Sequence, residues 1–147
     1  MQQALALLLL AFLHTLPLTA QSSQSTAPSA SQPEAVAATE ALTRKYALTA
    51  DQAKQMYQIQ VRKLRNQAEV ATLQTTNPTL YQAKRQSLQS GTLGSIRRLL
   101  RTKEQAQLYQ QTQADVRRLR AAKRKELLVQ LTPKEAVEAA LLDIYAE

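Results

Sequence analysis

The sequence predicts an all-α protein, built as an extended, bent helical hairpin of four to five helices that pairs as an antiparallel homodimer. Helix-forming Ala, Leu, Gln, Arg and Glu dominate the chain from Glu34 onward, and the chain contains only two glycines. Segments of the form Thr-x-x-Gln or Thr-x-x-Glu, typical of helix N-termini, begin at Thr49, Thr102 and Thr132. A homodimer is expected because long helices with narrow apolar faces bury little surface within one chain.

The residues before Glu34 fall into two segments. Residues 1–20 contain the apolar run Ala4–Leu13 and end in Leu-Thr-Ala, which predicts a signal peptide cleaved after Ala20. The run is shorter than the roughly 20 residues that a membrane-spanning helix needs. Residues 21–33 are rich in Ser, Gln, Ala and Pro, a composition that predicts a disordered tether. The mature chain is therefore expected in the periplasm or outside the cell, without a transmembrane segment.

Residues 34–147 are expected to form one helical domain. The expected helices are Glu34–Tyr46, Ala50 to about Leu73, Pro78 to Leu100 with Asn77 as its N-cap, Thr102 to Leu128, and Leu131–Tyr145. The apolar positions expected to face the core are Val36 and Leu42 in the first helix, Ala53, Tyr57, Val61, Leu64, Ala68 and Ala71 in the second, Leu80, Tyr81, Leu88, Ile96, Leu99 and Leu100 in the third, Tyr109, Val116, Leu119, Ala122, Leu127 and Leu128 in the fourth, and Ala136, Val137, Ala140, Leu141 and Ile144 in the fifth.

Capping boxes are predicted at three of these helix starts. In a capping box the Thr side chain accepts from the N3 backbone amide, and the N3 Gln or Glu side chain accepts from the N-cap amide. The residues that form these boxes and their preceding leucines are Leu48, Thr49, Gln52, Thr102, Gln105, Leu131, Thr132 and Glu135. In the last box Pro133 is expected at the first helical position.

The third predicted helix contains both glycines, Gly91 and Gly94. Two glycines cost about 2 kcal/mol relative to alanines in a helix interior. The sequence therefore predicts a kink or a close helix crossing at this point.

The composition excludes several classes of active site. Cleavage after Ala20 removes His14 and Phe12, the only histidine and the only phenylalanine, and the chain has no Cys or Trp. Metal sites built from imidazole or thiolate, Cys nucleophiles and Ser-His-Asp relays are thus excluded from the mature chain. The eleven acidic residues lie scattered along the sequence. We therefore expect a protein that is not an enzyme and has no cofactor, metal or catalytic residues.

Positive charge is concentrated in the middle of the chain. Residues 44–125 hold eighteen Lys and Arg against four acids, a net charge of +14, whereas residues 126–147 have a net charge of −4. The expected partner-binding basic face consists of Arg62, Arg65, Arg97, Arg98, Arg101, Arg117, Arg118, Arg120, Lys123 and Arg124. Helical spacing places Arg117, Arg120 and Arg124 on one side of their helix. An anionic partner is favoured over a merely solubilising surface because a continuous field of one sign attracts opposite charge.

Two of the three boxes suggest a family. Leu48–Gln52 reads Leu-Thr-Ala-Asp-Gln, and Thr102–Gln105 matches Thr-x-x-Gln with Arg101 in place of a preceding Leu. With the signal peptide, the helical pattern, the absence of Cys and the basic charge, the chain resembles the Spy/CpxP family of small periplasmic helical proteins, which is defined by two Leu-Thr-x-x-Gln motifs. The resemblance covers about residues 41–120.

The resemblance implies an ATP-independent periplasmic chaperone or stress-response regulator, a homodimer of bent hairpins whose concave, basic and partly apolar face binds clients. The leading hypothesis is a holdase for unfolded or acidic proteins. The alternatives are an envelope-stress regulator that binds an acidic sensor domain of the membrane, and a binder of anionic membrane surfaces or cell wall. Nucleic acid is not expected as a partner of an exported chain. The helix after Leu131 lies beyond the family pattern and is expected to dock onto the hairpin ends.

Overall fold

The computed structural model describes residues 32–145, and within that range the chain is helical without strands. The predicted all-α class is confirmed. The helices are α1 (Gln32–Tyr46), α2 (Ala50–Ala71), α3 (Leu73–Thr76), α4 (Pro78–Leu99), α5 (Lys103–Val129) and α6 (Lys134–Asp143). The predicted signal peptide and the tether up to residue 31 lie outside the described residues, while Gln32 and Pro33 already belong to α1. Dimerisation stays a prediction.

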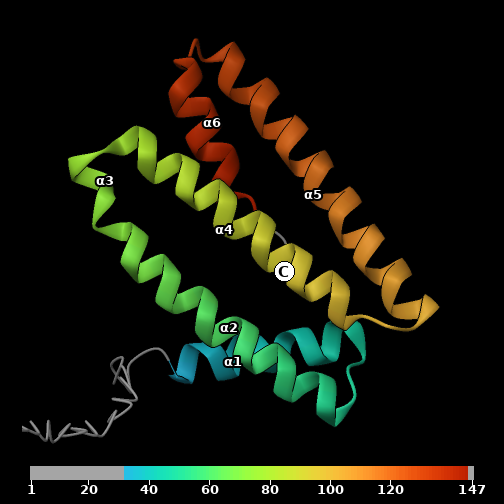
Figure 1. The fold of residues 1–147 in the computed structure, drawn as a ribbon. Helices are drawn as coiled ribbons and strands as arrows, with labels where there is room; N and C mark the ends of the chain where they lie inside the picture. Colours follow the sequence, from blue (N-terminus) through green and yellow to red (C-terminus); the bar gives the residue numbers. More distant parts are fainter. Residues whose placement is uncertain (1–31, 146–147) are drawn as a thin grey trace, which may run out of the picture.

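The helices form two connected hairpins (Figure 1). α2 and α4 lie side by side, with the single turn of α3 at their tip, and α1 packs against the base of α2 and contacts α5. α5 diverges from α4 at the base, and α6 folds back so that it contacts both α5 and α4. Asn77 begins α4 as expected, since its side chain accepts from the Leu80 amide and Pro78 occupies the first turn. α4 and α5 are thus joined at the base by their short connection and further along by α6.

The main core lies at the base, where α1, α2 and α4 meet. Its buried residues are Leu42, Tyr46, Leu48, Met56, Ile59, Ile96 and Leu99, with Leu100 and Tyr109 packed against them. The rings of Tyr46 and Tyr109 lie 6.4 Å apart between centroids, which joins α5 to this cluster. A smaller buried pair, Val137 and Leu141, anchors α6.

The predicted apolar faces are wrong in several places. On α2 the buried residues are Gln52, Met56, Ile59 and Gln60, none of which belongs to the predicted set. The predicted Ala53, Tyr57, Val61 and Leu64 are only half-buried, so the buried face is shifted around the helix from the expected one. Val36, Leu80, Leu119 and Leu128 were expected to be buried and are exposed. Ala68, Ala71, Ala122 and Ala136 are exposed too. The periodicity of apolar residues predicts how wide the buried face of a helix is. The neighbouring helices decide which side of the helix becomes buried.

The predicted interruption at the glycines does not occur. α4 is one continuous helix from Pro78 to Leu99. A Cβ added to Gly91 would meet no atom within 4 Å, and one added to Gly94 would meet only the Arg98 guanidinium at 3.6 Å. The glycines therefore do not serve a close helix crossing. Each has helical backbone, and the lost propensity is offset by packing of the helix elsewhere along its length.

The third predicted capping box is also wrong. α6 begins at Lys134, one residue later than the Thr132 box requires, with Pro133 as N-cap and no side-chain capping bond. Leu131 is 90% exposed and has φ of 55°, so it does not staple onto the helix. The Leu131 amide donates to the Leu128 carbonyl and the Thr132 amide to the Leu127 carbonyl, a Schellman turn that ends α5. The C-terminal turn of α5 thus competes successfully with the expected N-terminal box of α6.

Candidate functional site

The first two capping boxes meet in space. Thr49 and Thr102 each cap their helix through their hydroxyl, and Gln52 and Gln105 complete the boxes as predicted. In addition, the Gln52 Nε2 donates to the Gln105 Oε1 at 3.0 Å, and the Gln105 Nε2 donates back to the Gln52 Oε1 at 2.9 Å. Both side chains are buried. Two motifs separated by 53 residues therefore form one hydrogen-bonded pair.

This amide pair also satisfies the backbone at the helix ends around it. The Gln52 Nε2 donates to the Leu99 carbonyl at 2.8 Å, and the Gln105 Nε2 donates to the Ala47 carbonyl at 3.3 Å. The Arg101 amide donates to the Gln105 Oε1 at 3.0 Å. The ends of α1 and α4 and the starts of α2 and α5 are thus tied together, which determines the direction in which α5 leaves α4. The role of the motifs here is to position helices rather than to perform chemistry.

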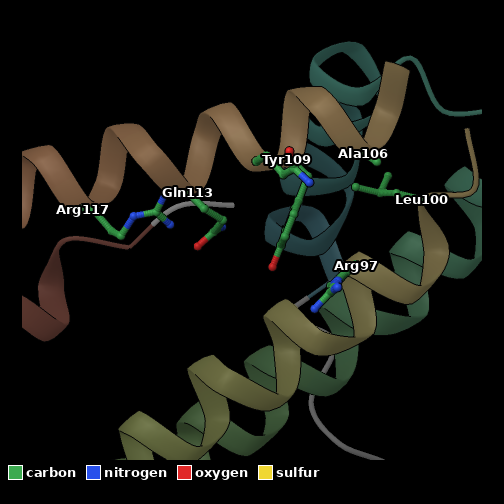
Figure 2. A pocket seen from close by; sticks show the side chains of 7 residues that line it. Arg97, Leu100, Ala106, Tyr109, Gln113 and Arg117 are labelled. Carbon is green, nitrogen blue, oxygen red and sulfur yellow. The ribbon is translucent and has the colours of Figure 1, made fainter. Parts of the chain in front are cut away.

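Beside this junction, α4 and α5 border a cleft of about 500 Å³ (Figure 2). We call it the α4–α5 cleft; its lining residues are Arg97, Leu100, Ala106, Tyr109, Gln110, Gln113 and Arg117. Figure 2 shows Tyr109 extending from α5 toward α4, where Arg97 lies near its hydroxyl end. Gln113 and Arg117 follow along α5. The cleft therefore combines an aromatic and aliphatic surface with two guanidinium groups.

Tyr109 connects this cleft to the core. Its hydroxyl donates to the Leu93 carbonyl at 3.4 Å. Burial raises the pKa of Tyr109 above its usual value, while the nearby positive charge of Arg97 partly opposes the shift by lowering this pKa. The phenol is therefore neutral at physiological pH, and the ring acts as a flat apolar surface with a polar edge.

The two cleft arginines have no acidic partner among the residues that the structure describes. Arg97 and Arg117 are exposed on helices that approach from opposite sides of the cleft, and none of the ion pairs between residues 32 and 145 includes them. The amide nitrogen of Gln113 is buried and makes no hydrogen bond within the same range. The cleft thus offers positive charge and a hydrogen-bond donor to an anionic or carbonyl-bearing ligand.

The other predicted basic residues divide into two groups. Arg62 and Arg98 line shallow grooves between α2 and α4, and Arg101 is exposed at the base. Arg65, Arg118 and Lys123 pair with Glu69, Asp115 and Glu126 on their own helices at 3.8, 3.2 and 2.7 Å. Such solvent-exposed pairs contribute little to stability, about 0–1 kcal/mol each. None of this group enters the α4–α5 cleft.

Arg120 and Arg124 contact α6 and the residue after it, although the Arg124 side chain stays half exposed. The Arg120 Nε donates to the Ile144 carbonyl at 2.9 Å, and the Arg124 Nη2 pairs with Glu138 at 3.0 Å. Arg117, Arg120 and Arg124 do share one side of α5 as the spacing predicts. Only Arg117, however, lies in the cleft, because the last turns of this side are covered by α6. The hypothesis that all three bind a partner stays a prediction, and Arg120 and Arg124 also make intramolecular contacts.

Arg85 and Gln89 of α4 are part of the same contact, and sequence reasoning missed them. Arg85 pairs with Asp143 at 2.8 Å, and the Gln89 side-chain amide donates to the Leu142 carbonyl. The charge pattern of the sequence could have predicted such a contact. The segment after residue 125 has a net negative charge, whereas the middle of the chain has a net positive charge. α6 lies between the C-terminal half of α5 and the N-terminal half of α4.

Residues 32–145 contain neither a metal-binding cluster nor a membrane-spanning helix. No group of three or more His, Cys, Asp or Glu in this range is arranged to hold a metal ion. Helices with the length and apolarity to cross a membrane are also absent from it.

The chain matches no family model, and comparison with curated proteins and with solved structures likewise found no match. The resemblance to the Spy/CpxP family therefore depends on the motif residues themselves.

Proposed function

We propose that the chain is an exported, ATP-independent chaperone whose α4–α5 cleft binds unfolded segments of acidic client proteins. The observation that carries the proposal is the combination, within one cleft, of Tyr109 and Leu100 with two arginines that lack acidic partners among residues 32–145. An unfolded acidic segment presents both apolar side chains and carboxylates. Arginine suits such varied contacts because its planar guanidinium binds carboxylates while its stem covers apolar surface.

The size of the site favours weak and reversible binding. A cleft of about 500 Å³ accommodates a few side chains rather than a whole folded domain. Binding energy then comes from a small contact area supplemented by electrostatic attraction, which accelerates encounter with acidic chains. The motif resemblance implies the same activity for a basic, partly apolar face. Export and the periplasmic location are supported by the predicted signal peptide.

The proposal is tested by an aggregation assay with a charge-reversed cleft. The purified mature protein should slow aggregation of a denatured acidic client at near-stoichiometric ratio without nucleotide. The double variant Arg97→Glu and Arg117→Glu should lose most of this effect at about 50 mM salt, where exposed charges are weakly screened. Arg120 and Arg124 are left unchanged in this experiment, because reversing them would also release α6.

The matched control is the double variant Lys84→Glu and Lys125→Glu. These two lysines are exposed on the same two helices and do not line the cleft. The control has the same change in net charge, so it separates the cleft from the overall charge. Equal protection by the wild type and both variants would contradict the proposal and leave the basic residues as a solubilising surface. Protection lost in both variants would show that net charge, not the cleft, is responsible.

A further inference from the structure

The α4–α5 cleft and the surface against which α6 packs lie on one continuous side of α5. Ala106, Tyr109, Gln113 and Arg117 line the cleft at spacings of three and four residues. Arg120 and Arg124 continue the same row, with Val116 buried beside it. We call this side of α5 the inner face. Its N-terminal half borders the open cleft, and its C-terminal half is covered by α6 (Figure 1).

α6 is an acidic amphipathic helix with one buried apolar side and two acidic side chains that pair with arginines. Val137 and Leu141, four residues apart, are 3% and 5% exposed and form its apolar side. Glu138 pairs with Arg124 of α5, and Asp143 pairs with Arg85 of α4. α6 is therefore held by its buried apolar side and by two ion pairs, one to the inner face of α5 and one to α4.

The C-terminal end of α6 is held through its backbone. The Arg120 Nε donates to the Ile144 carbonyl at 2.9 Å, and the Gln89 amide donates to the Leu142 carbonyl. Arg120 also reaches the Gln89 Oε1 at 3.5 Å, which links the two donors. The last carbonyls of a helix lack intrahelical donors and carry partial negative charge, so a cation and an amide are suitable partners. These contacts recognise a helix end and not one particular side chain.

From these contacts we infer that the inner face of α5, with the facing residues of α4, recognises acidic amphipathic helices, and that α6 is the chain's own occupant of half of it. The inference rests on the proposed function and deepens it, because it specifies which unfolded client segments bind: those that form an acidic amphipathic helix on this face. A matching client segment has two apolar residues four apart, an acid directly after the first, and a second acid near the helix end. Arg97 and Arg117 then bind in the open half as Arg85 and Arg124 do in the covered half.

α6 occupies the covered half of the inner face as an intramolecular ligand, so it should compete with a free helix for this surface. A segment tethered through a short turn has an effective concentration in the millimolar range, so it outcompetes a free helix of similar affinity. A free peptide with the α6 sequence should thus bind weakly to the wild-type chain. It should bind much more tightly once the chain's own α6 is released.

The test uses the full mature chain and a fluorescently labelled peptide of residues 132–145. In the variant Leu141→Asp a charge replaces a buried anchor of α6, which releases this helix. Fluorescence anisotropy should show at least about tenfold tighter peptide binding to this variant than to the wild type. A control peptide carrying Glu138→Lys and Asp143→Lys should bind neither protein, because its charges would repel Arg124 and Arg85.

A second variant tests release of α6 without changing a buried residue, since Leu141→Asp could also disturb other parts of the fold. Glu138→Lys changes a half-exposed residue, breaks its pair with Arg124 and leaves the core intact. It should also bind the unmodified peptide more tightly than the wild type does. Equal binding of the peptide by all three proteins, or binding by none, would overturn the inference even if the aggregation assay succeeds. Loss of chaperone activity with peptide binding retained would overturn the proposed function alone.

Discussion

The side-chain amides of Gln52 and Gln105 donate to one another at 3.0 and 2.9 Å across the buried junction of α2 and α5. Each glutamine first completes the N-terminal cap of its own helix. Gln52 also donates to the carbonyl of Leu99 at the end of α4, and Gln105 donates to the carbonyl of Ala47 just after α1. Local capping and tertiary packing are therefore carried out by one pair of residues.

Replacement of Gln52 by Leu should be strongly destabilising. It leaves the buried Gln105 amide and the Leu99 carbonyl without these partners, at a cost of about 2–3 kcal/mol in the free energy of unfolding. The double variant Gln52→Leu and Gln105→Leu should cost less than the sum of the two single variants, because neither orphaned amide then remains. Urea unfolding monitored by circular dichroism measures all three. Additive costs would show that the two amides do not act as a pair.

Replacement of Gln60, which lies on the same buried side of α2 as Gln52, should instead stabilise the protein. It is fully buried, its Oε1 has no hydrogen-bond partner among residues 32–145, and its Nε2 contacts only the Met56 sulfur at 3.8 Å. Gln60→Met keeps the side-chain volume and removes the unsatisfied oxygen. We expect the free energy of unfolding to rise by about 1 kcal/mol. A lower stability in urea would mean that the Gln60 amide has an essential role in the core.

The Schellman turn at Leu131 predicts a stabilising substitution. Leu131 has φ of 55° and is 90% exposed, so it carries backbone strain without burying apolar surface. Leu131→Gly should raise the free energy of unfolding by about 0.5–1 kcal/mol, because glycine adopts this conformation without a steric penalty. Leu131→Val should lower it, since a branched Cβ fits poorly there. Thermal unfolding of the two variants should therefore shift in opposite directions.

Thr49, which caps α2, and Thr132, which caps no helix, should respond differently to truncation. The Thr49 hydroxyl accepts from the Gln52 amide at 3.3 Å, so Thr49→Ala should cost about 1 kcal/mol. Thr132 forms no cap for α6, and Thr132→Ala should change stability by less than about 0.5 kcal/mol. Denaturant unfolding of both variants checks the comparison. Similar losses in both would indicate that the sequence-predicted third box exists in solution.

Tyr109 should titrate above the usual tyrosine pKa of 10. Because burial favours the neutral phenol, its contribution to stability is complete below pH 10 and is lost as the pH rises through the higher folded-state pKa. Arg97→Gln removes the positive charge that lowers this pKa, so the value should rise further. Ultraviolet titration with Tyr109→Phe as the reference isolates the signal. An unchanged or lower pKa in Arg97→Gln would place the arginine away from the ring in solution.

The sequence by itself determined the features of this protein that depend on residues close together in the chain. The all-α class, the N-caps at Thr49, Asn77 and Thr102, and the first two capping boxes follow from local propensity and from side chains that reach only three residues. The concentration of basic residues in the middle of the chain was equally readable. Such features depend on short-range geometry, which is the same in any tertiary context.

The tertiary structure decided which of these local features are buried, paired or exposed. Periodicity predicted a face of α2 that includes Ala53 and Tyr57, whereas packing against α1 and α4 buries the neighbouring face with Gln52 and Met56. The pairing of Gln52 with Gln105 and of Arg124 with Glu138 depends on where helices cross, so no local pattern contains it. The cleft exists for the same reason. The amide junction directs α5 away from α4, and α6 covers only the C-terminal half of the inner face of α5. Contacts between distant segments are set by the energy of the whole packed arrangement rather than by local sequence.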